Sequence, residues 1–313
     1  MKLRKLVTVT FCVAALCAVA SPGRTQAVTT IHVTTVPIDA GAEVWYAKEL
    51  GYFTKAGIDV EVVPAPNGGA AAASVAGSAA DIGYADTISI ASAFGRNVPF
   101  VIIAPAAVHQ SSGPTTVLVV AANSPIHSAK DLNGKTIAGS GLGTISGYAP
   151  RAWIEKNGGD LSSVKFVELA FPAMQPALDA GRIDAAAIAE PFLTAAKKTD
   201  RVLASPYDSV ARSFLVSAYF TMSPWAKDHP DLVNRFASAI HEAAVWANKN
   251  HAQSAEILLK YAKIDPSLAS QMTRSYYGEQ LNAGLLQPAV DLAAKYSKFT
   301  PFPASDLLYK APR

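Results

Sequence analysis

The amino-acid sequence predicts an α/β protein with two similar units. From Ile31 onward, short apolar runs alternate with helical segments, a rhythm typical of mostly parallel sheets flanked by helices. The rhythm breaks at residues 110–114 and then restarts. Residues 76–81 and 180–184 form a short internal echo, in which glycine ends a helix and aspartate opens a strand. The pattern is compatible with two sequential domains and with two interleaved ones.

The first unit is expected to contain four strands with helices between them. Each apolar run is short and is bounded by turn residues, which is the pattern of a buried strand. The strands are expected at residues 31–36, 59–64, 81–84 and 100–104, and the helices at 42–50, 69–77 and 88–94.

The second unit repeats the pattern and leads into a helical end. Ser128 is expected to cap a short helix that runs through Leu132, with Asp131 at the third helical position. A helix is expected at 148–156, and from Ser223 the chain reads as almost entirely helical. The strands are expected at 115–121, 136–139, 164–169, 185–189, 202–204 and 214–221.

Residues 1–27 have the features of a secretory signal peptide. A basic start is followed by an apolar core at residues 6–20, which is shorter than the roughly 20 residues of a membrane-spanning helix. Small-x-small sites end at Ala20 and Ala27, and we favour cleavage after Ala27. The residue before Cys17 is leucine, which does not suit a lipoprotein signal.

Removal of this segment changes the composition of the protein. It carries four of the 27 basic residues and no acidic one, so 23 basic residues remain against 24 acidic ones. A nearly neutral chain gives no reason to expect a nucleic-acid partner. Both cysteines, Cys12 and Cys17, lie within the segment, so we expect no disulfide, thiol nucleophile or cysteine metal site. The six histidines are scattered without ligand spacing, and we expect no metal or cofactor.

A glycine-rich loop, residues 139–147 (Gly-Ser-Gly-Leu-Gly-Thr-Ile-Ser-Gly), joins an expected strand to an expected helix. Free backbone N–H groups at such a helix start can bind an anion or a polar solute. The loop has neither the Lys-Ser/Thr of a phosphate-binding loop nor the spacing of a dinucleotide fingerprint. Gly143 is expected to need a conformation that suits glycine, and the longer side chain of Gly143→Val is expected to block closure of the lobes. The alternative is a simple strand-to-helix turn.

Open α/β sheets bind ligands beyond the carboxyl ends of their strands, and this rule selects the candidate site residues. Tyr219 lies near the expected return of the chain to the first unit. The candidates are Asp39, Gly41, Ala42, Asn67, Gly68, Tyr84, Asp86 and Thr87 in the first unit, Gly141, Gly143, Thr144, Ser146, Phe171, Glu190 and Phe192 in the second, and Tyr219.

The charges in these loops indicate two kinds of solute. The loops carry Asp39, Asp86 and Glu190, with no Lys or Arg before Arg151, and buried carboxylates require donors. A donor-bearing ring such as an aminopyrimidine suits them, whereas helix N-termini at Ala42 and residues 143–146 suit a sulfonate or nitrate. The two aspartates also fit as helix N-caps, Glu190 as a solvated turn residue, and the aromatic candidates as core.

Two segments near the start of the mature chain carry a family resemblance. Residues 46–53 (Tyr-Ala-Lys-Glu-Leu-Gly-Tyr-Phe) and 56–60 (Ala-Gly-Ile-Asp-Val) resemble the opening of type II periplasmic solute-binding proteins of ABC importers. The match is to the branch that takes alkanesulfonates, nitrate and thiamin-pyrimidine precursors. Residues 77–86, 128–135 and 178–192 are similar to that branch in character and order.

The resemblance implies a two-lobed molecule that encloses its solute in the cleft between the lobes. Lobe I would comprise residues 28–113 and 218–313, and lobe II residues 114–217. It also implies a periplasmic, monomeric receptor that serves an ABC permease and its ATPase subunit, without catalysis or membrane insertion. The alternatives are an enzyme that makes the pyrimidine precursor and a sensor subunit for a membrane kinase. The enzyme relatives carry a cysteine-rich motif, which the mature chain lacks.

Overall fold

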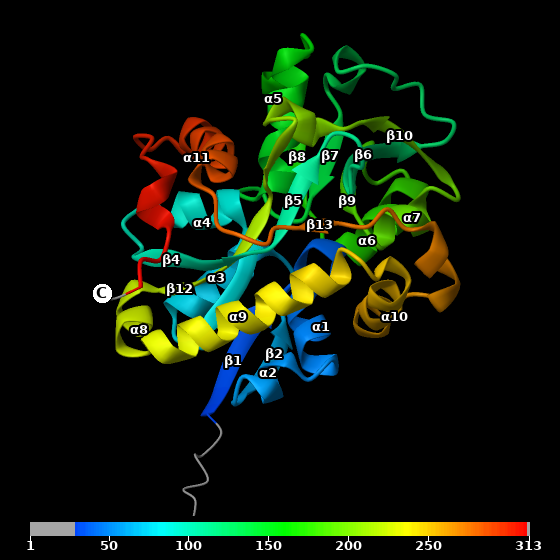
Figure 1. The fold of residues 1–313 in the computed structure, drawn as a ribbon. Coiled ribbons are helices and arrows are strands. Elements are labelled where there is room, and N and C mark those ends of the chain that lie inside the picture. Colours follow the sequence, from blue (N-terminus) through cyan, green and yellow to red (C-terminus); the bar gives the residue numbers. More distant parts are fainter. Residues whose placement is uncertain (1–28, 312–313) are drawn as a thin grey trace, which may run out of the picture.

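The computed structural model describes residues 29–311, which form two five-stranded sheets with helices packed on them (Figure 1). In Figure 1 the first sheet lies at the lower left and the second at the upper right. The predicted signal peptide lies outside the described residues. No helix of the described part is both long and apolar enough to cross a membrane.

The first sheet has the order β2-β1-β3-β12-β4. Its strands β1, β2 and β3 are parallel, whereas β12 is antiparallel to both of its neighbours. The strand bounds are β1 Thr29–Thr35, β2 Ile58–Pro64, β3 Ile82–Asp86, β4 Phe100–Pro105 and β12 Ser217–Met222.

The second sheet has the same order when it is read as β8-β7-β9-β6-β10. Strands β7, β8 and β9 are parallel, and β6 is antiparallel to its neighbours β9 and β10. Thus β6 and β12 hold equivalent places, and each enters its sheet after the chain has passed from the other one. The bounds are β6 Thr116–Ala121, β7 Thr136–Gly139, β8 Lys165–Glu168, β9 Ala185–Ala189 and β10 Asp200–Ala204. The predicted α/β class with two mostly parallel sheets is confirmed.

Eleven α-helices of the described chain flank the two sheets. Helix α11 packs against α4, and α9 runs across the lower part of the molecule beside α1 (Figure 1). The bounds are α1 Glu43–Glu49, α2 Tyr52–Lys55, α3 Gly68–Ala76, α4 Thr87–Phe94, α5 Ile145–Lys156, α6 Phe171–Asp179, α7 Phe192–Ala196, α8 Ser223–Asp228, α9 Pro230–Ala247, α10 His251–Ala262 and α11 Ala283–Ser297. Short 3-10 helices cover Asp39–Gly41, Lys130–Leu132, Leu161–Ser163, Pro206–Ser209, Pro266–Gln271 and Ala304–Leu307.

The internal echo of the sequence corresponds to one repeated hydrogen-bond motif. In the first sheet the Asp81 carboxylate accepts a hydrogen bond of 2.8 Å from the His32 amide. In the second sheet the Asp184 carboxylate accepts one of 2.8 Å from the Thr136 amide. Each aspartate thereby joins the start of one strand, β3 or β9, to its parallel neighbour, β1 or β7. The glycines differ, because Gly181 has a positive φ whereas Ser78, and not Gly77, takes that conformation in the first unit.

The structure corrects three details of the predicted elements. The expected strand at 214–221 is two strands, β11 Ser213–Leu215 and β12. Strand β11 pairs with β5 Ala107–Gln110, which pairs in turn with β13 Tyr276–Tyr277, and neither β5 nor β13 was predicted. Ser128 is not the N-cap of the 3-10 helix at 130–132, because its hydroxyl donates to the Asp131 carboxylate instead. The small sheet β11-β5-β13 spans the connection between the two large sheets.

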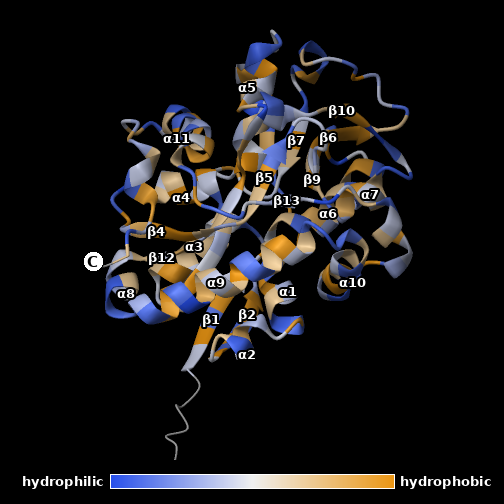
Figure 2. Cartoon of the chain, in the orientation of Figure 1, coloured by the Kyte–Doolittle hydropathy of each residue, from blue (hydrophilic) through white to orange (hydrophobic). Residues whose placement is uncertain are grey.

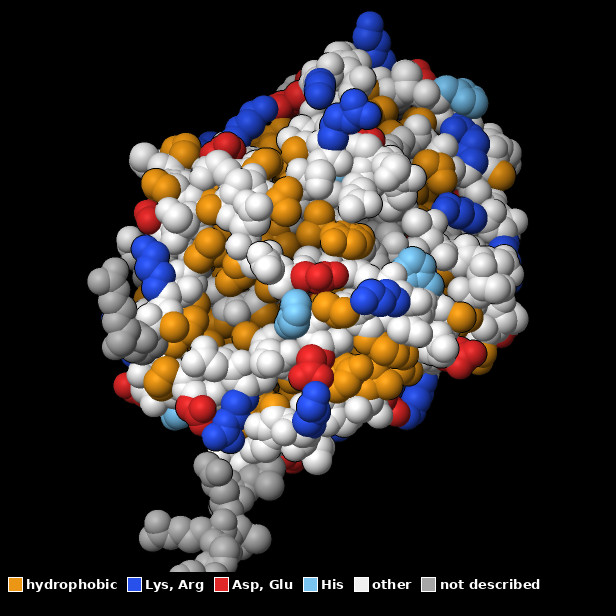
Figure 3. Space-filling model, in the orientation of Figure 1, with side chains coloured by type: hydrophobic (Ala, Val, Ile, Leu, Met, Phe, Trp, Pro, Cys, Tyr) orange, Lys and Arg blue, Asp and Glu red, His pale blue; other side chains and the backbone are white. Residues whose placement is uncertain are grey.

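Apolar residues concentrate along the strands of both sheets and on the inner faces of the helices (Figure 2). Phe53 of α2 stacks on Phe236 of α9, and Tyr219 of β12 meets the same ring edge-on. On the face drawn in Figure 3, acidic and basic side chains are interspersed.

Candidate functional site

A small cavity lies between the two sheets, beyond the carboxyl ends of β1, β3, β7 and β9. Its volume is about 30 Å³, which holds one or two water molecules. Its lining combines polar side chains with three aromatic rings. The lining residues are Val36, Ile38, Ala40, Asn67, Gly68, Tyr84, Asp86, Thr116, Ser140, Ile145, Ser146, Phe171, Ala189, Tyr207 and Val216.

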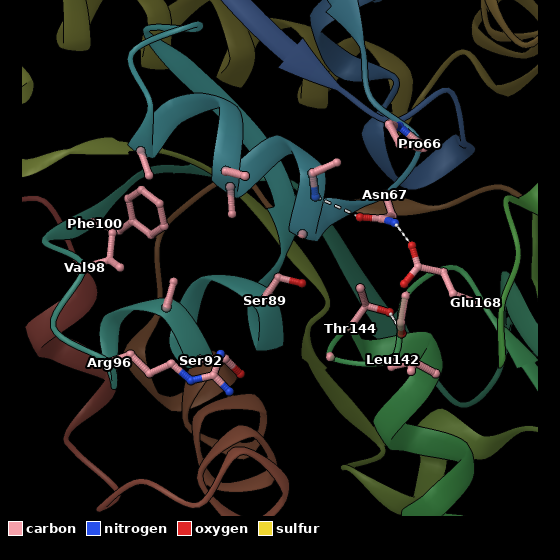
Figure 4. A pocket seen from close by; sticks show the side chains of 18 residues that line it. Pro66, Asn67, Ser89, Ser92, Arg96, Val98, Phe100, Leu142, Thr144 and Glu168 are labelled. Atoms are coloured by element: carbon pink, nitrogen blue, oxygen red, sulfur yellow. Dashed lines mark hydrogen bonds between the residues drawn. The ribbon is translucent and has the colours of Figure 1, made fainter. Parts of the chain in front are cut away.

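A larger open groove of about 540 Å³ adjoins the cavity and shares Asn67 with it. Figure 4 shows this groove between α3 and α4 on one side and the glycine-rich loop on the other. Its charged residues, Arg96 and Glu168, are exposed at its margin. The cavity and this groove together are called the cleft below, and the groove is the part of it that opens to solvent.

Asp86 joins the two sheets through its carboxylate. Oδ1 accepts hydrogen bonds of 3.0 Å from the amide of Ser89 on α4 and of 3.0 Å from the amide of Ile145 on α5. Oδ2 accepts a bond of 2.6 Å from the Ser89 hydroxyl. Burial raises the pKa of Asp86, and these hydrogen bonds oppose the rise. The Asp86 carboxylate is thus the N-cap of α4. It also accepts a hydrogen bond from the first residue of α5, on the other side of the cleft.

Asn67 makes a second connection across the cleft. Its Oδ1 accepts a bond of 2.9 Å from the Ala70 amide, which caps α3. Its Nδ2 donates to the Ser140 carbonyl at 2.7 Å and to Glu168 Oε1 at 3.0 Å. Dashed lines in Figure 4 mark the bonds of Asn67 to α3 and to Glu168. Asp86 and Asn67 are polar groups of the first unit that contact the glycine-rich loop region of the second.

The glycine-rich loop is tightly packed at three of its four glycines. A Cβ on Gly139 would lie 2.8 Å from the Ser146 carbonyl oxygen, and one on Gly147 would lie 2.6 Å from that of Gly141. A Cβ on Gly141 would lie 2.6 Å from the Thr144 methyl carbon. Gly143 is exposed, has no positive φ and has open space around it, so the prediction that it requires glycine is wrong.

Gly147→Ala is expected to lower the free energy of unfolding by about 1–3 kcal/mol, because the new methyl group overlaps backbone oxygens that have little room to move. Urea denaturation measures the change. Gly143→Ala is the matched control, since the nearest atom to its Cβ would be the Tyr148 hydroxyl at 3.9 Å. Equal stability of the two variants would contradict this account of the loop.

Asp39 is held in a buried ion pair that the sequence did not reveal. Arg274 Nη2 lies 2.7 Å from Asp39 Oδ1, and Nε donates to the same oxygen at 2.9 Å. The Ser275 amide donates to Oδ2. Arg274 also donates to the Tyr46 hydroxyl at 2.8 Å and to the His251 carbonyl at 2.6 Å. The view that the acidic candidates lack a cation until Arg151 is therefore wrong for Asp39.

Glu190 is fully buried, so the alternative of a solvated turn residue is wrong. Its Oε2 accepts a bond of 3.0 Å from the Thr194 amide, and Oε1 one of 2.9 Å from the Thr194 hydroxyl. The Thr273 amide approaches Oε1 at 3.4 Å. Burial raises the pKa of Glu190 to about 7. The side chain does not line the cavity, and a direct role in solute binding stays a prediction.

All the candidate site residues fall into three groups by their place relative to the cavity and the groove. Six candidates line the cavity, namely Asn67, Gly68, Tyr84, Asp86, Ser146 and Phe171. Three line the adjoining groove, namely Gly141, Gly143 and Thr144. Those that line neither space are Asp39, Gly41, Ala42, Thr87, Glu190, Phe192 and Tyr219.

Most of this last group has identifiable packing or hydrogen-bond partners. The Tyr219 hydroxyl accepts a bond of 3.0 Å from the Val44 amide, and the Thr87 hydroxyl donates to the Leu215 carbonyl at 2.8 Å. Phe192 stacks on Phe171 with ring centroids 6.4 Å apart, so it supports a cavity residue from behind. Gly41 and Ala42 are buried beside β1.

Thr116 and Tyr207 line the cavity although the carboxyl-end rule missed them. Thr116 is the first residue of β6 and lies opposite Ala189, the last residue of β9. Because β6 runs antiparallel to β9, the amino end of β6 lies at the edge of the sheet where β9 has its carboxyl end. Tyr207 lies in a 3-10 helix, outside any strand. Among the described residues, no group of three or more His, Cys, Asp or Glu side chains is placed to hold a metal ion.

The two-lobed arrangement, with a cavity between two sheets of equal strand order, is the fold of periplasmic binding proteins. The chain belongs to the NMT1/THI5-like family, which matches residues 41–254. The resemblance inferred from the sequence is thereby confirmed. A search of curated protein sequences finds no match.

Solved structures with low sequence identity share this fold. The periplasmic aliphatic sulphonate binding protein SsuA from Escherichia coli is similar with a TM-score of 0.72 and 18% identity, over 91% of this chain and 93% of that chain. The periplasmic nitrate-binding protein NrtA from Synechocystis PCC 6803 gives 0.67 and 17%, over 79% and 69%. The desulfurization enzyme DSZB gives 0.69 and 15%, over 90% and 96%. The fold therefore occurs in binding proteins and in an enzyme.

Proposed function

We propose that this protein is a solute-binding receptor of an ABC importer. It captures a small organic solute between its lobes and delivers it to a membrane permease and its ATPase subunit. The observation that carries the proposal is the pair of polar connections across the cavity, from Asp86 to the Ile145 amide and from Asn67 to the Ser140 carbonyl. Groups that join two lobes around a cavity are placed to bind a solute there as the lobes close.

The lobes of the proposed receptor are lobe I, residues 28–113 and 218–313, and lobe II, residues 114–217. The place of β12 in the first sheet and of β6 to β10 in the second supports this division. The small sheet β11-β5-β13 is the proposed hinge, because β5 and β11 lie on the two passages between the lobes. The receptor acts as a monomer in the periplasm after cleavage of the signal peptide.

The solute of this receptor is thiamin-pyrimidine-like or alkanesulfonate-like. Family membership and the likeness to SsuA support these two classes of solute. The likeness to DSZB keeps an enzyme as the alternative. The receptor is favoured because both cysteines of the chain precede residue 28, and the pyrimidine-making relatives use a cysteine-rich motif. A sensor subunit would use the same cleft and differ only in its membrane partner.

The test is solute-induced movement of the lobes. Protein purified from its own host is analysed by native mass spectrometry to identify a retained solute. That solute is then returned to the solute-free protein during small-angle X-ray scattering. We expect a change in the radius of gyration and an unchanged solute mass after prolonged incubation. Conversion of the solute to a product would establish the enzyme instead, and the lack of any retained or added ligand would refute the receptor.

A further inference from the structure

The last turn of α11 carries three consecutive residues that contact α5. Glu155 on α5 forms an ion pair with Lys295 and accepts a hydrogen bond of 2.7 Å from the Tyr296 hydroxyl. The Tyr148 hydroxyl lies 3.0 Å from the Ser297 hydroxyl, and the ring centroids of Tyr148 and Tyr296 are 5.2 Å apart. We call these five residues the clasp. The described residues that line the cleft include none of them.

The two sides of the clasp belong to different sheets. Helix α11 packs on α4, which follows β3 of the first sheet, and the Ser297 hydroxyl also lies 2.9 Å from that of Ser92 on α4. Helix α5 follows β7 of the second sheet, where the Arg151 guanidinium lies 3.8 Å from the centre of the Phe166 ring on β8. Figure 1 shows α11 beside both α4 and α5. The clasp therefore joins the proposed lobes outside the cleft.

We infer that the clasp holds the cleft shut and thereby sets how tightly any solute is retained, an inference that rests on the proposed receptor function. A solute that binds only the closed form is held in proportion to the fraction of molecules that are closed. The clasp raises this fraction without reaching the solute. It therefore changes the affinity for every solute by one common factor and does not select among them.

Helix α5 is attached to the first lobe at three points along its length. The Ile145 amide donates to Asp86 at the first residue of the helix, Tyr148 follows one turn later, and Glu155 lies about 15 Å further along the axis than Ile145. A helix moves as a rigid body on the scale of one hydrogen bond. Movement of Ile145 away from Asp86 therefore pulls on the clasp, and opening of the cleft breaks it.

The clasp has a buried neutral half and an exposed charged half. Tyr148 is 9% exposed, so its hydroxyl contact is shielded from water. The Lys295 and Glu155 side chains are 58% and 37% exposed, so dissolved salt screens their attraction. Closure of the cleft should therefore weaken as the ionic strength rises.

The test follows hydrogen exchange of two backbone amides by NMR in the solute-free protein. The Ile145 and Ser89 amides donate to the same oxygen, Asp86 Oδ1, from opposite sides of the cleft. Opening frees only the Ile145 amide, because Ser89 and Asp86 both lie at the start of α4. We expect the Ile145 amide to be less protected from exchange than the Ser89 amide. Equal protection would show that the lobes do not part at Asp86 short of unfolding, and would overturn the inference.

Tyr148→Phe is expected to speed exchange of the Ile145 amide by about 2- to 12-fold, the effect of losing one neutral hydrogen bond. Glu155→Ala is expected to speed it by about 1.5- to 5-fold, the effect of losing an exposed ion pair. In salt of about 1 M, where the screening length is about 3 Å, the wild type should show most of this second increase. Glu155→Ala should show no further increase in salt. The salt measurement on the wild type needs no variant, so misfolding of a variant would not protect the inference.

Lys156→Ala is the matched control, because it removes a neighbouring exposed charge of α5 and leaves the clasp in place. Its Ile145 amide should exchange as in the wild type. Unchanged Ile145 exchange in both Tyr148→Phe and Glu155→Ala would mean that the clasp persists while the cleft opens, and the inference would fail. No solute enters this experiment, so its failure leaves the receptor intact, whereas the receptor itself depends on the host-solute experiment.

Discussion

We expect Arg274→Met to lower the free energy of unfolding by about 3–5 kcal/mol, because it leaves the Asp39 carboxylate buried without its cation. The two side chains are 5% and 1% exposed, so water cannot replace the guanidinium. The substitution also removes the hydrogen bonds to the Tyr46 hydroxyl and the His251 carbonyl. Urea denaturation followed by circular dichroism measures the loss.

Arg235→Met is the matched control for this prediction. Arg235 pairs with Asp231 one helical turn away on α9, where the Asp231 side chain is 70% exposed, and such pairs contribute about 0.3–0.5 kcal/mol. The double variant Asp39→Asn/Arg274→Met should be more stable than Arg274→Met, since it no longer buries an unpaired charge. Equally mild effects of Arg274→Met and Arg235→Met would contradict the view that the buried pair of Asp39 and Arg274 stabilises the fold.

Glu190→Gln is expected to become more stable relative to the wild type by about 3 kcal/mol between pH 4 and pH 8, because the raised pKa of Glu190 makes the wild type lose stability over this range. Burial raises the pKa of Glu190 to about 7 in the folded protein, from an ordinary value of 4.5. The folded state therefore holds a proton that the unfolded state releases. The stabilising contribution of this proton is complete below pH 4.5 and is lost as the pH rises to 7. Glutamine does not titrate, so its variant escapes this loss.

The measurement is the difference in unfolding free energy between variant and wild type at each pH. A difference is needed because burial also raises the pKa of Glu43 and of Asp200, the latter to about 6, and both groups change stability in the same direction. Glu256→Gln on the exposed face of α10 is the control and should show no such trend. A flat difference for Glu190→Gln would mean that this carboxyl is hydrated in the folded protein.

The large elements were predictable because they are encoded locally. Strands β7 and β9 begin and end at the predicted residues, since each is a short apolar run closed by polar or small residues. The strands of the small sheet β11-β5-β13 were not predictable in this way. Strand β13 has two residues, and β11 and β12 are divided by Val216 within one apolar run. Their identity depends on pairing with distant segments, which local patterns do not record.

The candidate site was predictable where it follows from parallel strands. The carboxyl-end rule found Asn67 and Asp86, which begin helices directly after β2 and β3. It missed Thr116, because the reversed direction of β6 brings an amino end to the same edge. It also missed Arg274, which lies 235 residues from Asp39 in a segment that reads as helical. A partner at that distance is set by tertiary packing and leaves no periodic signal.

The small volume of the cavity has a consequence for the speed of solute capture. In the proposed receptor, a solute reaches the cavity only after the connections made by Asp86 and Asn67 are broken, so opening precedes binding. The association rate is therefore expected to rise with solute concentration and then to level off at the rate of lobe opening. Motions of this kind take microseconds to milliseconds. At high solute concentration, loading is timed by the protein's own movement and no longer by diffusional encounter.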